Sequence, residues 1–187
     1  MLINKNSLKI WKKNSNLLDW TIKPKKIFER KRDKSFRWYL DGKINLYYNL
    51  IVKNLKKNPD KTAIITLSKN HEIKKYSYKD IDALVDNFSF NLSSLKKVNR
   101  VMIHSSATLN SAISMLSCIK NGIFFSVIFK ELPIKAISIR VNLFKPDLII
   151  TENKKFLNSI KVQTKNKFLI YDFKDLNKQN YLKLGSK

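Results

Sequence analysis

The chain has 187 residues, and its 38 Lys and Arg residues against 14 Asp and Glu residues give a formal net charge of +24. Apolar residues make up 43% of the sequence, which excludes an intrinsically disordered chain, because disorder combines high charge with low hydrophobicity. The single cysteine, Cys118, excludes an internal disulfide framework and suits a reducing compartment. No apolar stretch approaches the roughly 20 residues of a membrane span, and no secretory signal opens the chain, so we expect a soluble cytoplasmic protein.

The ratio of lysine to arginine helps to decide whether the positive charge indicates a nucleic-acid partner. A pI near 10.1 would ordinarily indicate a nucleic-acid partner, but only five of the basic residues are arginines. Arginine is the residue that reads guanine edges and grips phosphate bidentately, so this composition favours a lysine-coated surface over a nucleic-acid footprint. The densest basic cluster, residues 23–37, remains a candidate phosphate-binding patch, although Phe28 and Phe36 lack the regular spacing of a stacking surface.

The first part of the chain gives few periodic signals. Residues 1–41 show no long amphipathic run, and we expect their three tryptophans to pin an irregular or helical segment onto a neighbouring domain. Asn45 has the position of a cap for a helix that ends before Pro59. We therefore divide the chain into an N-terminal segment, 1–57, and a larger domain, 58–187.

In the larger domain strands and helices alternate, which is typical of a parallel sheet covered by helices. Ser77 and Asp80 have the spacing of a capping box at the start of a long helix. Residues 101–129 hold one basic residue and no carboxylate, so we expect that whole stretch to be buried. The fold class is α/β. The other predicted elements are strands 62–67 and 72–76 joined by a turn, strand 100–103, helix 109–121, strand 123–129, helix 133–144, strand 147–151, helix 155–159 and strand 168–171.

Residues with reactive side chains are few. His104 precedes Ser105 and Ser106 at the end of a predicted strand, where α/β proteins place ligands. Neighbouring strand residues point to opposite faces, and no G-x-S-x-G elbow is present, so the simpler interpretation is a polar strand end rather than a Ser–His nucleophile. Cys118 lies among apolar residues and reads as a small core residue. The acidic pair at 29 and 33 reads as charge partners of basic neighbours, not as a metal site.

Glycine content bears directly on nucleotide chemistry. The chain holds three glycines, Gly42, Gly122 and Gly185, and no two are close together. A phosphate cradle needs several glycines in one short loop, so that backbone N–H groups can approach the phosphates. The sequence therefore predicts no glycine-rich ATP site, and we assign no catalytic, cofactor-binding or metal-binding residue.

Four stretches, in this order, resemble the start of the acetyl-CoA and propionyl-CoA synthetases of the adenylate-forming superfamily. The strongest marks the acetyl/propionyl branch, and the resemblance runs from about Leu18 to Tyr171. The stretches are 38–49 (WYLDGKINLYYN), similar to W-F-x-G-G-x-L-N-x-x-Y-N; 76–81 (YSYKDI), similar to Y-T-Y-x-E-L; 99–103 with 115–122 (NRVMI and MLSCIKNG), similar to G-D-R-V-x-I and A-M-L-A-C-x-R-I-G-A; and 126–129 with 147–151 (SVIF and DLIIT), similar to S-V-V-F and x-I-T.

The resemblance implies a known chemistry. Such enzymes use ATP, Mg²⁺ and CoA to convert acetate or propionate to an acyl-adenylate and then to acyl-CoA, releasing AMP and PPi. The family's phosphate loop, acyl pocket and mobile C-terminal domain with its adenylation lysine lie downstream, and this chain stops at Lys187, after roughly the opening third. Within the matched part, the family's paired glycines are Lys130 and Glu131 here. The family's x-x-G-R motif for CoA falls at 155–161, where glycine and arginine are absent.

We therefore expect a truncated N-terminal piece of a short-chain acyl-CoA synthetase, inactive alone, whose partner is a second polypeptide that completes the enzyme. Its N-terminal segment, 1–57, corresponds to the family's N-terminus and 58–187 to the start of the AMP-binding domain. Two alternatives stay open: a basic nucleic-acid-binding α/β protein, and a non-catalytic partner of a full-length synthetase. We do not expect a membrane or nucleic-acid partner.

Overall fold

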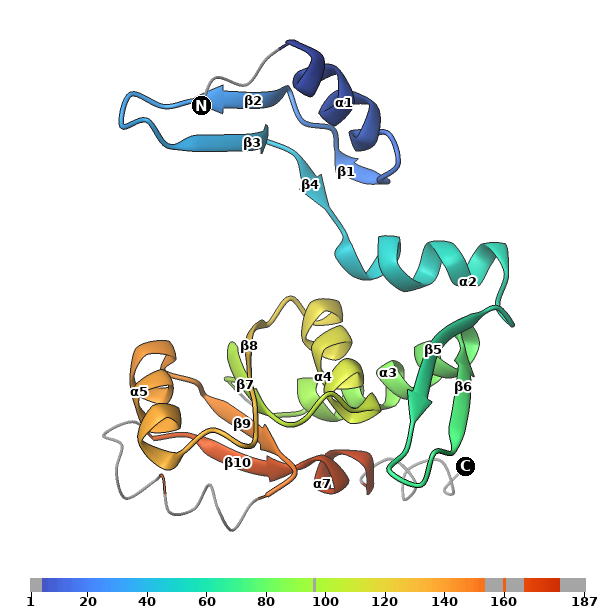
Figure 1. Cartoon of the computed structure of the whole chain (residues 1–187), viewed down its shortest axis with the longest axis vertical. Coiled ribbons are helices and arrows are strands. Elements are labelled where there is room, and N and C mark those ends of the chain that lie inside the picture. The colour runs from blue at the N-terminus through green and yellow to red at the C-terminus, as the bar shows by residue number, and fades with distance from the viewer. Residues whose placement is uncertain (1–4, 96, 154–159, 161–166, 179–187) are drawn as a thin grey trace. The chain divides into compact units, whose positions relative to one another are not determined.

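The computed structural model describes residues 5–95, 97–153, 160 and 167–178 (Figure 1). The chain divides into two units, Met1–Asn54 and Leu55–Lys187, and each is described by itself. The first unit holds the Trp-rich segment, and the second holds a parallel sheet with its helices.

The first unit is built around aromatic contacts. Its elements are α1 (Lys5–Ser15), β1 (Trp20–Ile22), β2 (Lys26–Arg30), β3 (Phe36–Leu40) and β4 (Lys43–Ile44), with β1 antiparallel to β4 and β2 antiparallel to β3. The ring of Trp38 lies 5.1 Å from Trp11 and 5.0 Å from Phe28, and Trp20 lies 5.3 Å from Tyr39, measured between centroids. The segment that we expected to be irregular or helical is thus one helix and two strand pairs, whose strands are too short to show a period of two.

A helical stretch runs from the end of the first unit into the first residues of the second. It comprises η1 (Tyr48–Val52), a turn of π-helix, and α2 (Lys53–Lys57). The Asn45 side-chain oxygen accepts a hydrogen bond from the Tyr48 N–H at 2.8 Å, so the predicted cap is confirmed. Asn49 ties this stretch to the segment after α1, because its side chain accepts from the Asp19 N–H at 2.8 Å and donates to the Asp19 carbonyl at 3.0 Å.

The second unit opens with a hairpin and a capped helix. β5 (Thr62–Leu67) pairs with β6 (Ile73–Ser77) across the predicted turn, and α3 (Tyr78–Ser93) follows directly. The Ser77 hydroxyl accepts from the Asp80 N–H at 3.1 Å while the Asp80 carboxylate accepts from the Ser77 N–H at 2.8 Å. The predicted capping box is therefore confirmed in both directions.

The sheet of the second unit is wholly parallel, as the alternation predicts. Its strands are β7 (Arg100–His104), β8 (Phe124–Ile128), β9 (Leu148–Thr151) and β10 (Leu169–Asp172), in the spatial order β10-β9-β7-β8. The helices between and after them are α4 (Leu109–Lys120), α5 (Ile134–Phe144) and α7 (Phe173–Lys178). The observed bounds differ from the predicted ones by at most one residue at either end, and the predicted helix 155–159 lies outside the described residues.

The core lies on both faces of β7 and β9. On one face Met102, Ile128 and Ile149 form a cluster with Ile137 and Val141 of α5. On the other face α3 packs on α4, and Ser117 donates a hydrogen bond to the Val85 carbonyl at 3.4 Å. The α/β fold class is confirmed by this arrangement, which Figure 1 shows.

One prediction about burial is wrong. Residues 101–129 are not buried throughout, because β8 lies at the edge of the sheet that the described strands form. The side chains of Phe124, Val127 and Phe129 are exposed, whereas Val101 to Ile103 of the neighbouring strand are fully buried. Lack of charge identified the hydrophobic stretch but could not show which strand ends the sheet.

Candidate functional site

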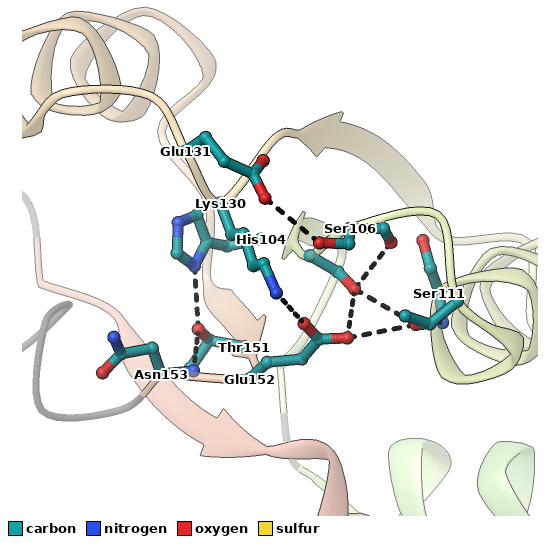
Figure 2. A network of polar contacts seen from close by, with 10 residues as sticks. His104, Ser106, Ser111, Lys130, Glu131, Thr151, Glu152 and Asn153 are labelled. Carbon is teal, nitrogen blue, oxygen red and sulfur yellow. Dashed lines mark hydrogen bonds and ion pairs between the residues drawn. The ribbon is translucent and has the colours of Figure 1, made fainter. Parts of the chain in front are cut away.

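Polar side chains gather where β7, β8 and β9 end. Because the three strands are parallel and adjacent, their carboxyl ends meet at one edge of the sheet, where open α/β sheets place ligands. Figure 2 shows these side chains converging, from the residues after β7, after β8 and at the end of β9. Ser105 also joins the backbone to the neighbouring strand, because its N–H donates to the Ile128 carbonyl at 3.1 Å.

The first part of this cluster is the pair His104 and Thr151. The two residues are opposite each other in the β7–β9 register, and His104 Nδ1 lies 2.8 Å from Thr151 Oγ1. Both side chains are buried, and burial lowers the pKa of His104, since a charged imidazole would lose its hydration. His104 is therefore a neutral ring near neutral pH. The Thr151 hydroxyl also accepts from the Asn153 N–H at 2.9 Å, which fixes the turn after β9.

The second part centres on the Glu152 carboxylate. Glu152 Oε1 accepts hydrogen bonds from Ser105 Oγ at 2.8 Å and from Thr108 Oγ1 at 3.1 Å, and Lys130 Nζ lies 3.6 Å from Oε2. Burial alone would raise the pKa of Glu152, but the two hydroxyl donors and the nearby ammonium hold that pKa below its usual value. Glu152 is therefore an ionised carboxylate with three partners.

The Glu152 carboxylate also lies at the beginning of a helix. Thr108 is the N-cap of α4, and its hydroxyl accepts from the Ser111 N–H at 3.3 Å. A negative charge is stabilised at a helix N-terminus by the unpaired N–H groups and the helix dipole. The Glu152 carboxylate is thus the negative charge at the N-terminus of α4, a position where a helix can otherwise bind an anion from solution.

Two members of the cluster stand where the resembled family has paired glycines. Lys130 makes the ion pair with Glu152, and Glu131 accepts a hydrogen bond from Ser106 Oγ at 3.3 Å. Sequence reasoning noted both replacements but did not connect them with residues near 105 or 152. The available signal was their shared position just after parallel strands, and Glu152 was missed although it follows a predicted strand.

The other residues considered from the sequence have structural partners. His104 forms a hydrogen bond with Thr151, and Ser105 donates one to Glu152, so the described partners of these two residues lie at the end of β9 and just after it. Cys118 is a free, buried core residue, and burial raises the pKa of its thiol to about 12. Glu29 lies in β2 and pairs with the basic neighbour Lys26 at 3.2 Å, as predicted, while Asp33 accepts a hydrogen bond from Ser35 Oγ in the following turn.

The basic cluster at 23–37 lies on and around the β2–β3 hairpin of the first unit. Its aromatic residues Phe28 and Phe36 are in ring contact, with centroids 5.5 Å apart, and therefore serve the packing of the hairpin. The expected CoA motif region, 155–161, falls on residues that the structure does not describe, apart from Ile160, which is buried.

A cavity of about 610 Å³ lies beside the cluster, between the β5–β6 hairpin and the start of α4. Its lining is mixed, with apolar residues such as Ile64, Leu67 and Leu109 beside polar and charged residues such as Glu72, Lys74 and Asn110. Within the described ranges, no group of three or more His, Cys, Asp and Glu side chains is placed to hold a metal ion. No helix in the described part of the chain has the length and apolar character needed to cross a membrane.

Known proteins match the chain over almost its whole length. The family model described as acetyl-coenzyme A synthetase N-terminus matches residues 4–50, and the model described as AMP-binding enzyme matches residues 51–185. Acetyl-coenzyme A synthetase of Bdellovibrio bacteriovorus is 33% identical over 137 residues, which are 70% of this chain and 21% of that protein. Acetyl-coenzyme A synthetase of Escherichia coli (strain K12) is 32% identical over 154 residues, which are 77% of this chain and 23% of that protein.

Among solved structures, acetoacetyl-CoA synthetase from Streptomyces lividans superposes with a TM-score of 0.76 at 10% identity, covering 92% of this chain and 30% of that chain. At that identity the likeness shows the fold alone. The chain spans about a fifth of the length of the curated relatives that it matches. The predicted resemblance is confirmed by the order of the two matched models and by the curated relatives. The chain belongs to the AMP-binding enzyme family and corresponds to the N-terminal portion of its acetyl-CoA synthetase members.

Proposed function

We propose that this chain provides the N-terminal portion of a short-chain acyl-CoA synthetase, which converts acetate or propionate, ATP and CoA to acyl-CoA, AMP and PPi. The observation that carries the proposal is the succession of the two matched family models, the acetyl-CoA synthetase N-terminus over 4–50 and the AMP-binding enzyme over 51–185. Two relatives that are 33% and 32% identical to the matched part of this chain are acetyl-CoA synthetases.

The proposal also holds that this portion does not catalyse the reaction alone. Acyl-adenylate formation needs donors that cradle the ATP phosphates and a metal ion that neutralises their charge. With three separated glycines the sequence has no glycine-rich loop, and within the described ranges no three His, Cys, Asp or Glu side chains cluster in a way that could hold a metal ion. ATP, Mg²⁺ and CoA would therefore be bound by the remainder of the synthetase, whether it is joined to Lys187 or carried on a second polypeptide.

In that enzyme the carboxyl-edge cluster would have a positioning role. Glu152, Ser105 and Thr108 hold the turn after β9 against the start of α4. The same proposal places the chain in the cytoplasm, where a reducing environment keeps Cys118 a free thiol.

The test is an assay of acetate-dependent or propionate-dependent exchange between pyrophosphate and ATP. The chain is assayed alone, then mixed with a polypeptide that carries the E. coli relative from the end of its matched region to its C-terminus. That second polypeptide alone is the matched control. We expect exchange only in the mixture. Exchange by the chain alone would contradict its inactivity, and a mixture that forms a complex without exchange would contradict the synthetase role.

A further inference from the structure

The edge strand of the parallel sheet, β8, exposes large apolar side chains. In the part of the chain that the structure describes, β8 pairs with β7 on one side, and the sheet order β10-β9-β7-β8 leaves its other side without a strand. Its exposed side chains are large and apolar: Phe124 is 75% exposed, Val127 is 41% exposed, and Phe129, just after the strand, is 64% exposed. Apolar surface of this kind on a strand edge favours pairing with a further strand.

The register shows which main-chain groups are free to pair. The Phe124 N–H donates to the Asn99 carbonyl at 3.0 Å, and the Ile128 carbonyl accepts from the Ser105 N–H at 3.1 Å. Residues 124, 126 and 128 therefore direct their backbone groups toward β7. Because these directions alternate along a strand, the N–H and C=O groups of Phe125 and Val127 point outward from the sheet.

Charge supports the same interpretation. Natural proteins protect exposed strand edges with lysine, proline or a bulge, and this chain has lysines to spare. The hairpin strand β6 carries Lys74 and Lys75, yet residues 121–129 contain no charged residue and no proline. An uncharged edge on a chain of net charge +24 indicates an edge that another segment covers.

Both faces of the edge are apolar. Phe124 is opposite Arg100 in the register, and the Arg100 guanidinium lies over the Phe144 ring of α5, 5.3 Å from its centroid, so Phe124 belongs to the α5 face. Val127, one residue out of phase with Ile128 of the α5-side cluster, belongs to the opposite face. A strand added here would meet apolar side chains above and below, as a strand of a doubly covered parallel sheet does.

We propose that the outward edge of β8 receives a strand from the remainder of the synthetase, with an apolar side chain on each face. This inference rests on the proposed function, since the occupant is part of that enzyme. The matched relatives supply the necessary length, because the aligned part is 23% of the E. coli protein and most of that protein lies outside the match. Main-chain pairing at a sheet edge is a general way in which one polypeptide segment recognises another.

The direct test is amide hydrogen exchange, residue by residue, on the whole chain. In the chain alone we expect the outward Phe125 and Val127 amides to exchange fast and the inward Ser126 amide slowly. Adding the E. coli remainder should slow the two outward amides by at least about tenfold, since they would then exchange only on opening of the complex. Ser126 is the internal control. Outward amides that stay fast in a formed complex would overturn the proposal.

A pair of variants provides the second measurement. Val127→Pro removes the outward N–H without removing a bond to β7, whereas Val127→Thr keeps the N–H and the β-branched shape. We expect Val127→Thr to bind the remainder like wild type and Val127→Pro to bind at least about tenfold more weakly, as a blocked strand edge requires. The circular dichroism spectrum shows whether each variant folds. If Val127→Pro does not fold, the hydrogen-exchange measurement on the wild-type chain alone tests the proposal.

The outcomes separate this inference from the function it rests on. Equal binding by Val127→Pro and wild type would overturn the edge proposal while leaving the synthetase role intact. Outward amides that become protected in the chain alone as its concentration rises would show that a second copy covers the edge, which also overturns it. Failure of wild type to bind the remainder at all would instead count against the proposed function.

Discussion

The Glu152 carboxylate accepts a hydrogen bond from Ser105 Oγ at 2.8 Å across 47 positions of sequence. This bond joins the residue after β9 to the residue after β7, and the bond from Thr108 adds the start of α4 to the same carboxylate. Three segments are thus fixed to one another at a single charged group. The carboxyl edge of the sheet is therefore held by side chains of this chain.

Replacing the carboxylate tests this arrangement. Glu152→Gln keeps the size of the side chain but removes the charge that Lys130 and the two hydroxyls stabilise. The pKa of Glu152 is lowered in the folded state, so its contribution to stability is present above its ordinary value of 4.5 and is lost as the pH falls through the lower folded value. We expect the variant to have a lower urea midpoint than wild type near neutral pH, and the gap to close in acid.

The matched control for that series is Glu131→Gln. Glu131 belongs to the same edge but accepts one long hydrogen bond, from Ser106 at 3.3 Å, and is exposed. Its substitution should move the urea midpoint less at every pH. A pH-independent gap for Glu152→Gln would show that the variant loses packing rather than an ionised hydrogen-bond network.

Two phenylalanines, one buried and one exposed, allow the contributions of the core and of the β8 edge to stability to be compared. Phe88 of α3 is 1% exposed, whereas Phe124 of β8 is 75% exposed. Truncating Phe88→Ala leaves a cavity and should lower the free energy of unfolding by about 3–5 kcal/mol. Phe124→Ala in the chain alone should change it by less than about 0.5 kcal/mol, because little surface is buried there. Urea denaturation measures both, and similar losses would mean that the β8 edge is already covered in the isolated chain.

Cys118 provides a probe of global opening. The thiol is fully buried, and burial raises its pKa to about 12, so little thiolate forms near neutral pH. We expect a thiol-specific disulfide reagent to label the folded chain on the order of a thousandfold more slowly than a free thiol, from the thiolate fraction alone. Labelling in urea should become fast at the same midpoint that circular dichroism gives. Fast labelling without urea would place Cys118 in a locally opening segment.

Much of the second unit was predictable because its signals are local. The capping box of Ser77 and Asp80 and the uncharged run around Ile103 each depend on a few neighbouring residues, and both mark elements that the structure contains. The family motifs added the order of the elements. The first unit was harder, because strands of two to five residues, such as β4 (Lys43–Ile44), carry no period, and their stability comes from ring contacts such as Trp11 with Trp38.

The carboxyl-edge cluster shows a different limit. Lys130 and Glu152 are 22 positions apart in the sequence, and each by itself reads as one more surface charge. Only the strand order brings their ends together, because β7 lies between β8 and β9. The same order decides that β8 ends the sheet. Pairing between distant strands is a property of the whole fold, so neither the cluster nor the exposed edge could be read from local sequence.

The two described glycines make a final prediction, since each is required for a different reason. Gly42 has no unusual backbone angle, but a Cβ at that position would lie 2.8 Å from Trp20 Cζ3. Gly122 has open space around it, but its φ of +66° belongs to the left-handed region at the end of α4. Gly42→Ala should therefore displace Trp20, whereas Gly122→Ala should strain the backbone and cost about 1 kcal/mol.

The tryptophan indole resonances separate these two effects. The Trp20 Nε1–H donates to the Ser15 carbonyl at 2.7 Å, so displacing the ring alters its chemical shift directly. We expect Gly42→Ala to shift that indole resonance, and Gly122→Ala to leave it in place while lowering the urea midpoint of the second unit. Gly122→Asn is the matched control, because asparagine tolerates the left-handed region and should recover part of the loss. An unmoved Trp20 resonance in Gly42→Ala would mean that the first unit has room for the methyl group, and that the glycine in this motif is not needed for packing.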